Sequence, residues 1–165
     1  MGAADIDRGG PPRDRSAVAD KRRFDLFADL VTRHFPGCRQ AYDIAGGQGR
    51  LNAALRARGV DALTFDTRWK HDDVPYAERK FTLDEPCGCD LLVGMHPDGA
   101  TRIIVEYAAA HRRPFAIVPC CSDNGLPYKP WMRHLAELGD QLGLAVDEVA
   151  LPMQGRARVL LGRPR

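Results

Sequence analysis

The stretch AYDIAGGQGRL, residues 41–51, decides the fold class of this chain. Its first five residues are mostly apolar and are typical of a short buried strand. The following RLNAALRARG, residues 50–59, has the pattern of a helix that ends at Gly59. A second strand is predicted at DALTFD, residues 61–66. A strand, a helix and a strand in this order predict a βαβ unit with a glycine-rich turn after its first strand.

The rest of the chain continues this alternation. An amphipathic helix is predicted from an N-cap at Ser16 to PG at 36–37, with its apolar face formed by Phe24, Phe27, Val31 and Phe35. Strands are predicted at KFTL (80–83), DLLVGMH (90–96), FAIVP (115–119), VDEVALP (146–152) and RVLLGRP (158–164). Helices are predicted at TRIIVEYAAAHRR (101–113) and PWMRHLAELGDQLG (130–143), the second with Trp131, Leu135, Leu138 and Leu142 on one stripe. We therefore predict an α/β fold, a Rossmann-like three-layer sandwich whose mostly parallel sheet has a C-terminal antiparallel strand.

The composition sets the class of protein. A length of 165 residues with 44% hydrophobic content predicts one domain, which we place at residues 16–165 behind a disordered leader at 1–15 that is rich in Gly, Pro, Arg and Asp. The formal charge of +2 gives no strong field toward nucleic acid or membranes. The chain has no apolar run of about 18 residues and no secretory signal pattern, and its five cysteines are an odd number. We expect a cytoplasmic protein with reduced thiols and no membrane partner.

Two familiar phosphate-binding loops do not match the glycine turn. A P-loop needs Lys and then Ser or Thr after its last glycine, whereas Arg50 and Leu51 follow Gly49 here. A dinucleotide fingerprint would place its third glycine at Asn52, where glycine allows close packing of helix and strand. A nucleoside triphosphate is therefore disfavoured, and NAD stays open as an alternative ligand.

The turn instead has an acid followed by small residues two, four and six positions later: Asp43, Ala45, Gly47 and Gly49. In this it resembles the first motif of the class I S-adenosylmethionine-dependent methyltransferases, in which three glycines follow the acid and the loop packs against the methionine and ribose part of the cofactor. Ala45 replaces the first glycine. The resemblance implies S-adenosylmethionine as cofactor.

A second acid, Asp66, ends the next predicted strand, at the position that in this family binds the ribose hydroxyls. A carboxylate can accept from both vicinal hydroxyls, so Asp66 supports a ribose of any cofactor, and a solvated turn aspartate is the alternative. Adenine contacts are expected from the segment before the strand at 90–96, where Asp84 is a candidate. The expected cofactor-binding residues are Asp43, Ala45, Gly46, Gly47, Gly49, Asp66 and Asp84.

The resemblance extends over about residues 40–122. LLVGMHPDG and FAIVPCC are similar to the branch of this superfamily with a histidine after the fourth strand and a Cys-Cys pair after the fifth, which includes enzymes that methylate tRNA ribose. This branch usually has His, a small residue, Cys and Gly, whereas the chain has HPDG. The resemblance implies that His96 and Asp98 act on the acceptor or position it. His96 is a general base in one interpretation and a strand-end histidine bonded to the backbone in the other.

Cys120, Cys121 and Tyr128 are the expected acceptor-side residues, with Tyr128 stacking on a flat substrate. For the cysteines, the alternatives are one core thiol and one pocket thiol, a catalytic thiolate, or a metal site with His96. Neighbouring residues of an extended chain point in opposite directions, so we expect no metal. Cys87 and Cys89 precede a strand and should lie nearly 20 Å from its far end, about 3.3 Å per residue, which disfavours a four-cysteine zinc site.

The sequence therefore predicts an S-adenosylmethionine-dependent methyltransferase whose acceptor is unidentified, with RNA and a small molecule both open. The basic clusters at 21–23 and 112–113 are balanced by acidic residues and are interpreted as a solvated face. A non-catalytic cofactor- or nucleotide-binding scaffold of the same fold is the main alternative, and an NAD-dependent oxidoreductase is the third. The oligomeric state is left open.

Overall fold

The structure is a computed structural model that describes residues 13–68, 73–97, 99–119, 122 and 124–165, with side chains from Arg22 onward. Its helices are α1 (Arg13–His34), α2 (Arg50–Arg56), α3 (Thr101–His111) and α4 (Tyr128–Gln141). Its strands are β1 (Gln40–Ile44), β2 (Asp61–Asp66), β3 (Tyr76–Glu78), β4 (Leu91–Met95), β5 (Phe115–Val118), β6 (Leu144–Ala150) and β7 (Arg158–Pro164). No helix in the described ranges has both the length and the apolar character that a membrane span requires.

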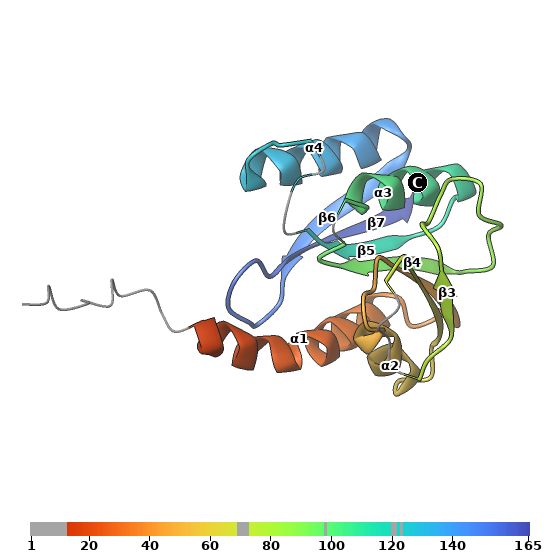
Figure 1. Ribbon diagram of the computed structural model, residues 1–165. Coiled ribbons are helices and arrows are strands. Elements are labelled where there is room, and N and C mark those ends of the chain that lie inside the picture. The colour runs from red at the N-terminus through yellow and green to blue at the C-terminus, as the bar shows by residue number, and fades with distance from the viewer. Residues whose placement is uncertain (1–12, 69–72, 98, 120–121, 123) are drawn as a thin grey trace, which may run out of the picture.

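The seven strands form one sheet in the order β3-β2-β1-β4-β5-β7-β6 (Figure 1). Pairs from β3 through β5 are parallel, and β7 runs antiparallel to both of its neighbours. This confirms the predicted mostly parallel sheet with a C-terminal antiparallel strand. The chain runs outward from β1 to β2 and β3 on one side and to β4 and β5 on the other. In such sheets, ligands bind beyond the carboxyl ends of the strands at the point where the strand order reverses. Here that point lies between β1 and β4, so a ligand site is expected at their carboxyl ends.

Helices cover both faces of the sheet and make the predicted three layers. Figure 1 shows α1 and α2 on one face and α3 and α4 on the other. Phe27 and Val31 of α1 are fully buried in the core with α2, and Phe24 and Phe35 pack against its margin. The apolar stripe predicted from the sequence is therefore the face that α1 buries. Trp131, Leu135 and Tyr107 fill the other layer.

The third strand is not where the sequence predicted it. KFTL, residues 80–83, forms no strand, and the residues that pair with β2 are Tyr76–Glu78. Phe81 instead inserts its ring edge-on among Phe65 and Tyr107, with ring centroids 5.1 and 4.7 Å away. The apolar signal of KFTL thus came from one anchoring side chain, not from a paired strand.

Two helix ends also differ. Helix α1 begins at Arg13, so it starts inside the predicted leader and Ser16 is not its N-cap. Residues 1–12 lie outside the described part of the chain. In α4 the apolar stripe ends at Leu138, because Leu142 follows the helix and is 42% exposed.

Candidate functional site

The loop after β1 has an unusual backbone. Ala45, Gly47 and Gly49 have φ angles of 54°, 58° and 81°, all in the left-handed region. Glycine reaches this region without strain, whereas an alanine there costs about 1–2 kcal/mol. These are the three small residues at alternate positions after Asp43 that the sequence pattern indicated. Their conformation turns the chain sharply from β1 into α2. Because these residues have small side chains or none, the backbone of the loop is not covered by side chains of its own.

Asp43 lies directly beneath this loop and is fully buried. Its Oδ2 accepts a hydrogen bond from the Thr64 hydroxyl at 2.8 Å, and its Oδ1 has no hydrogen-bond partner among the residues that the structure describes. Burial raises the pKa of this carboxyl to about 7, against the Thr64 hydrogen bond and with a smaller contribution from Asp66. A Cβ on Gly46 would lie 2.1 Å from Asp43 Oδ2, so only glycine fits over the carboxylate.

Asn52 extends this contact into a buried polar network. Its side-chain amide donates to Thr64 Oγ1 at 3.0 Å and to the carbonyls of Ala62 and Pro75 at 3.1 Å. Arg56 Nε donates to Asn52 Oδ1 at 2.9 Å. Asn52 thus ties α2 to β2 and to the segment before β3. One signal for this network is visible in the sequence, a polar residue on the apolar face of a short helix.

Asp66 lies at the end of β2 beside the same loop, as predicted. Its Oδ2 accepts from the Gly47 N–H at 2.8 Å, and its Oδ1 accepts from the Arg68 N–H at 3.2 Å. The Tyr76 hydroxyl donates to the Gly47 carbonyl at 2.5 Å. A carboxylate offers about four acceptor positions, so Asp66 can fix the loop and still accept from a ligand.

A cavity of about 350 Å³ opens over the loop. It is lined by Arg23, Phe24, Ala45, Gly46, Gly47, Gln48, Arg50, Arg68, Met95 and His96. This volume is near the lower end of the range for small-molecule sites. The three arginines come from α1, the start of α2 and the segment after β2. The cavity therefore has positively charged side chains beside the backbone of the glycine loop. It can hold a ligand that carries an anionic group.

The position of His96 bears on both interpretations made for it, a general base and a strand-end residue bonded to the backbone. The His96 backbone N–H donates to the Val118 carbonyl at 2.9 Å, as a strand-end residue would, and the residue is one of those that line the cavity. Its φ of 51° is in the left-handed region, which histidine adopts more readily than most residues. This backbone turns the chain away from β4.

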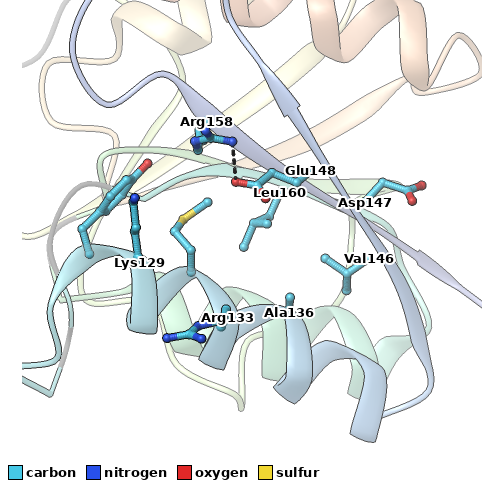
Figure 2. A pocket seen from close by; sticks show the side chains of 10 residues that line it. Lys129, Arg133, Ala136, Val146, Asp147, Glu148, Arg158 and Leu160 are labelled. Atoms are coloured by element: carbon cyan, nitrogen blue, oxygen red, sulfur yellow. Dashed lines mark hydrogen bonds and ion pairs between the residues drawn. The ribbon is translucent and has the colours of Figure 1, made fainter.

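A second cavity of about 580 Å³ lies between α4 and the β6–β7 hairpin. Figure 2 shows Leu160 at its centre, with the Arg158–Glu148 ion pair (3.4 Å) on the hairpin side. Tyr128 lines this cavity, and the Arg156 guanidinium lies 4.3 Å from the centre of its ring. Tyr128 does not belong to the described lining of the cavity at the glycine loop.

The structure does not bring Asp84 to the loop, and three further predicted site residues lie outside the part that it describes. Asp84 is an exposed residue of the turn after Phe81, and it is absent from the described lining of the cavity. Asp98, Cys120 and Cys121 lie outside the described residues, so their assignments stay predictions.

Comparison with known proteins identifies the fold. No family model matches the sequence. No curated protein matches it either. Solved structures do: an O-methyltransferase family protein from Burkholderia thailandensis superposes with a TM-score of 0.58 at 18% identity, over 92% of this chain and 60% of that chain. Ribosomal protein L11 methylase from Lactobacillus delbrueckii gives 0.64 at 14% identity, over 84% and 77%.

Magnesium protoporphyrin IX methyltransferase from Synechocystis, solved with bound S-adenosylmethionine, gives a TM-score of 0.65 at 12% identity. The match covers 90% of this chain and 81% of that one. This chain spans 60% of the Burkholderia protein. The chain therefore has the Rossmann-like fold of the class I methyltransferases, as the sequence predicted.

Proposed function

We propose that this chain is a cytoplasmic S-adenosylmethionine-dependent methyltransferase that acts on an acceptor still to be identified. The observation that carries the proposal is the buried Asp43, one of whose oxygens has no partner in the described part of the chain, beneath a glycine loop that borders a cavity. A buried polar atom without a partner is costly and calls for an explanation such as a missing ligand. The shared fold supports the same assignment.

The residues at the glycine loop and along the cavity fit the cofactor's chemical groups, although Asp43 and Asp66 are not in the described lining of the cavity. Asp66 would accept from the ribose hydroxyls, and Asp43 would orient the end that carries the amino group. Arg23, Arg50 and Arg68 offer charge for the carboxylate. When bound, the cofactor supplies a methyl group activated by a positively charged sulfur.

On the acceptor side, we assign His96 the role of general base, because it is one of the residues that line the same cavity. An imidazole can take the proton from a hydroxyl or amine near neutral pH. Methyl transfer otherwise needs little more than an aligned nucleophile at the right distance. Asp98, Cys120 and Cys121 stay proposed as residues that position the acceptor, whereas Tyr128 borders the second cavity. The acceptor itself, RNA or a small molecule, is open, since the neighbouring structures include enzymes named for a ribosomal protein and for a magnesium porphyrin.

The test is calorimetric titration of the full chain with S-adenosylhomocysteine, with NAD in parallel. We expect micromolar binding of S-adenosylhomocysteine and no binding of NAD. Asp66→Ala should weaken binding at least tenfold, and Asp61→Ala, at the exposed far end of β2, is the matched control. Binding of NAD alone would support an oxidoreductase, and binding of neither would contradict the proposed cofactor. Binding without any methyl transfer would support the scaffold alternative.

A further inference from the structure

The second cavity, between α4 and the β6–β7 hairpin, has no part in the proposed function. Helix α4 packs closely against β6 near its last turn, where a Cβ on Gly139 would lie 2.6 Å from Val146 Cγ2. Toward the start of the helix, the same face carries Ala136 and then Met132, and both line the cavity. The space between helix and hairpin has a volume of about 580 Å³, within the usual range for small-molecule sites.

The inner wall of this cavity is apolar. Met132 and Leu160 are buried, and Ala136 and Val146 are partly exposed. Figure 2 shows Leu160 at the centre of the cavity, between the helix and the hairpin. Such a wall favours the apolar body of a ligand, because both apolar surfaces are removed from water when they meet.

The two acids of the cavity wall already have cationic partners. Glu148 accepts a hydrogen bond from Arg158 at 3.4 Å, and both residues line the cavity (Figure 2). The Asp147 Oδ2 atom lies 4.0 Å from the Arg163 Nη1 atom. The negative charge on the hairpin side is therefore balanced, and a cationic ligand would have to compete with two arginines.

The two cations that α4 contributes have no such partners. Lys129 and Arg133 line the cavity, and within the described residues neither of them forms an ion pair. Arg133 does not pair even with Glu137, which follows it by one helical turn. Lys129 and Arg133 are four residues apart on one helix, so they are neighbours and repel each other. An anion between them would remove this repulsion and meet two positive charges.

We propose that this cavity is a binding site for a small amphipathic organic anion. The apolar body of the ligand lies against Met132 and Leu160, and its acidic group accepts hydrogen bonds from Lys129 and Arg133. Such a ligand matches both features of the cavity, the apolar wall and the two cations without acidic partners.

This site is distinct from the cavity at the glycine loop. The described linings of the two cavities share no residue. The first is lined by Met95 at the end of β4 and the second by Leu160 of β7, and β5 lies between these two strands. Figure 1 also shows α4 on the face of the sheet opposite α1 and α2. We therefore expect the two cavities to bind their ligands independently.

The test uses two fluorescent dyes with the same aromatic skeleton. The dye 8-anilinonaphthalene-1-sulfonate carries a sulfonate, and N-phenyl-1-naphthylamine lacks it. The folded full chain is titrated with each dye at pH 7, with and without S-adenosylhomocysteine. A ligand of about twenty non-hydrogen atoms should bind with a Kd on the order of tens of micromolar. The anionic dye should bind about tenfold more tightly than the neutral one, and S-adenosylhomocysteine should not displace it.

Charge variants locate the acidic group of the dye. Lys129→Gln combined with Arg133→Gln should weaken binding of the anionic dye by about tenfold and leave the neutral dye unchanged. The matched control combines Lys80→Gln with Arg39→Gln, at two exposed residues that line neither of the two described cavities. This control loses the same net charge and should bind both dyes as the wild type does.

A cavity-filling variant locates the apolar body. Ala136→Phe should weaken binding of both dyes several-fold. Its control is Ala145→Phe, because Ala145 is exposed and lies on the opposite face of β6 from its neighbour Val146. Thermal unfolding shows whether each variant is folded, and the charge variants decide the matter if Ala136→Phe is not.

Four results would each overturn the proposal: no dye binding to the folded wild type, equal affinity for the two dyes, an unchanged Kd in the Lys129 and Arg133 double variant, or displacement of the dye by S-adenosylhomocysteine. The outcome is separate from that of the proposed function. If calorimetry finds no binding of S-adenosylhomocysteine, the proposed cofactor is wrong, whereas the dye titrations of the wild type and the variants still decide whether the second cavity binds an anion.

Discussion

The Thr64 hydroxyl donates a hydrogen bond of 2.8 Å to Asp43. Within the described residues, this is the one side-chain hydrogen bond that the buried carboxylate receives. The same hydroxyl oxygen accepts from the Asn52 amide at 3.0 Å. Thr64 is therefore the link between the polar network under α2 and the acid under the glycine loop. Its loss would leave a buried acceptor and a buried donor without this partner.

Thr64→Val should destabilise the fold by about 1–3 kcal/mol at pH 8, because a buried polar group without its partner costs that much. Thr64→Ser is the matched control, since it keeps the hydroxyl and loses only the methyl group. Urea denaturation of the three proteins measures the effect. Equal stability of the Val and Ser variants would show that the hydrogen bond contributes little.

Asp43 should make stability depend on pH. The pKa of its carboxyl is raised by burial to about 7 in the folded chain, from 3.8 in the ordinary case. Between about pH 4 and 7 the unfolded chain releases this proton and the folded chain keeps it, so raising the pH favours unfolding. The Asp43→Asn variant has no ionisable group at this position, so its stability lacks this contribution to the pH dependence.

Wild type should therefore lose stability relative to Asp43→Asn as the pH rises from 4 to 7, by an amount on the order of a few kcal/mol, and the difference should level off above pH 7. Denaturation curves at several pH values measure it. A difference independent of pH would mean that Asp43 titrates alike in both states.

Alanine at either Gly46 or Gly47 should destabilise the fold, but for different reasons and to different degrees. A Cβ on Gly46 would lie 2.1 Å from Asp43 Oδ2 and 2.7 Å from the Thr64 methyl carbon, so Gly46→Ala should destabilise by more than about 2 kcal/mol. At Gly47 nothing lies within 4 Å, so Gly47→Ala should cost only the roughly 1–2 kcal/mol of its positive φ.

Because Gly47 borders the cavity, its variant should nevertheless bind S-adenosylhomocysteine at least tenfold more weakly. Thermal unfolding and calorimetry together separate the two effects. Full affinity in a folded Gly47→Ala protein would mean that the cofactor does not approach this residue.

Ala45 offers a test of stored backbone strain. Its φ of 54° costs alanine about 1–2 kcal/mol, while glycine loses more conformational freedom on folding, by up to about 1 kcal/mol. Ala45→Gly should thus be neutral or stabilise the fold by up to about 1 kcal/mol. A loss of stability larger than this in urea would show that the alanine methyl group makes contacts that matter.

The parts of the site that follow from local pattern were predictable, and the parts that depend on packing were not. Strand periodicity and glycine spacing placed Asp43 and Asp66 at neighbouring strand ends, where the structure has them. Tyr76 was missed because its hydroxyl reaches Gly47 from 29 residues away, and because Tyr76 begins β3, a strand that the sequence analysis placed too late, at residues 80–83. Arg23 was on a correctly predicted helix, but the angle at which α1 packs decides that it borders the cavity.

His96 provides the final prediction, which concerns chemistry. Asparagine tolerates the left-handed backbone that His96 adopts at φ 51° but cannot act as a general base, so His96→Asn removes the imidazole with little added strain. We expect S-adenosylhomocysteine affinity within about threefold of wild type. Incorporation of labelled methyl groups from S-adenosylmethionine into RNA and small-molecule fractions should fall by about 10²-fold or more, as for the loss of a general base.

The control is Met95→Leu, which keeps an apolar side chain at the neighbouring position of the cavity wall and leaves the imidazole in place. Its methyl transfer should stay within a few-fold of wild type. If His96→Asn binds cofactor normally and transfers methyl groups as fast as Met95→Leu, then the imidazole is not the general base, and the base has to be sought elsewhere on the cavity wall.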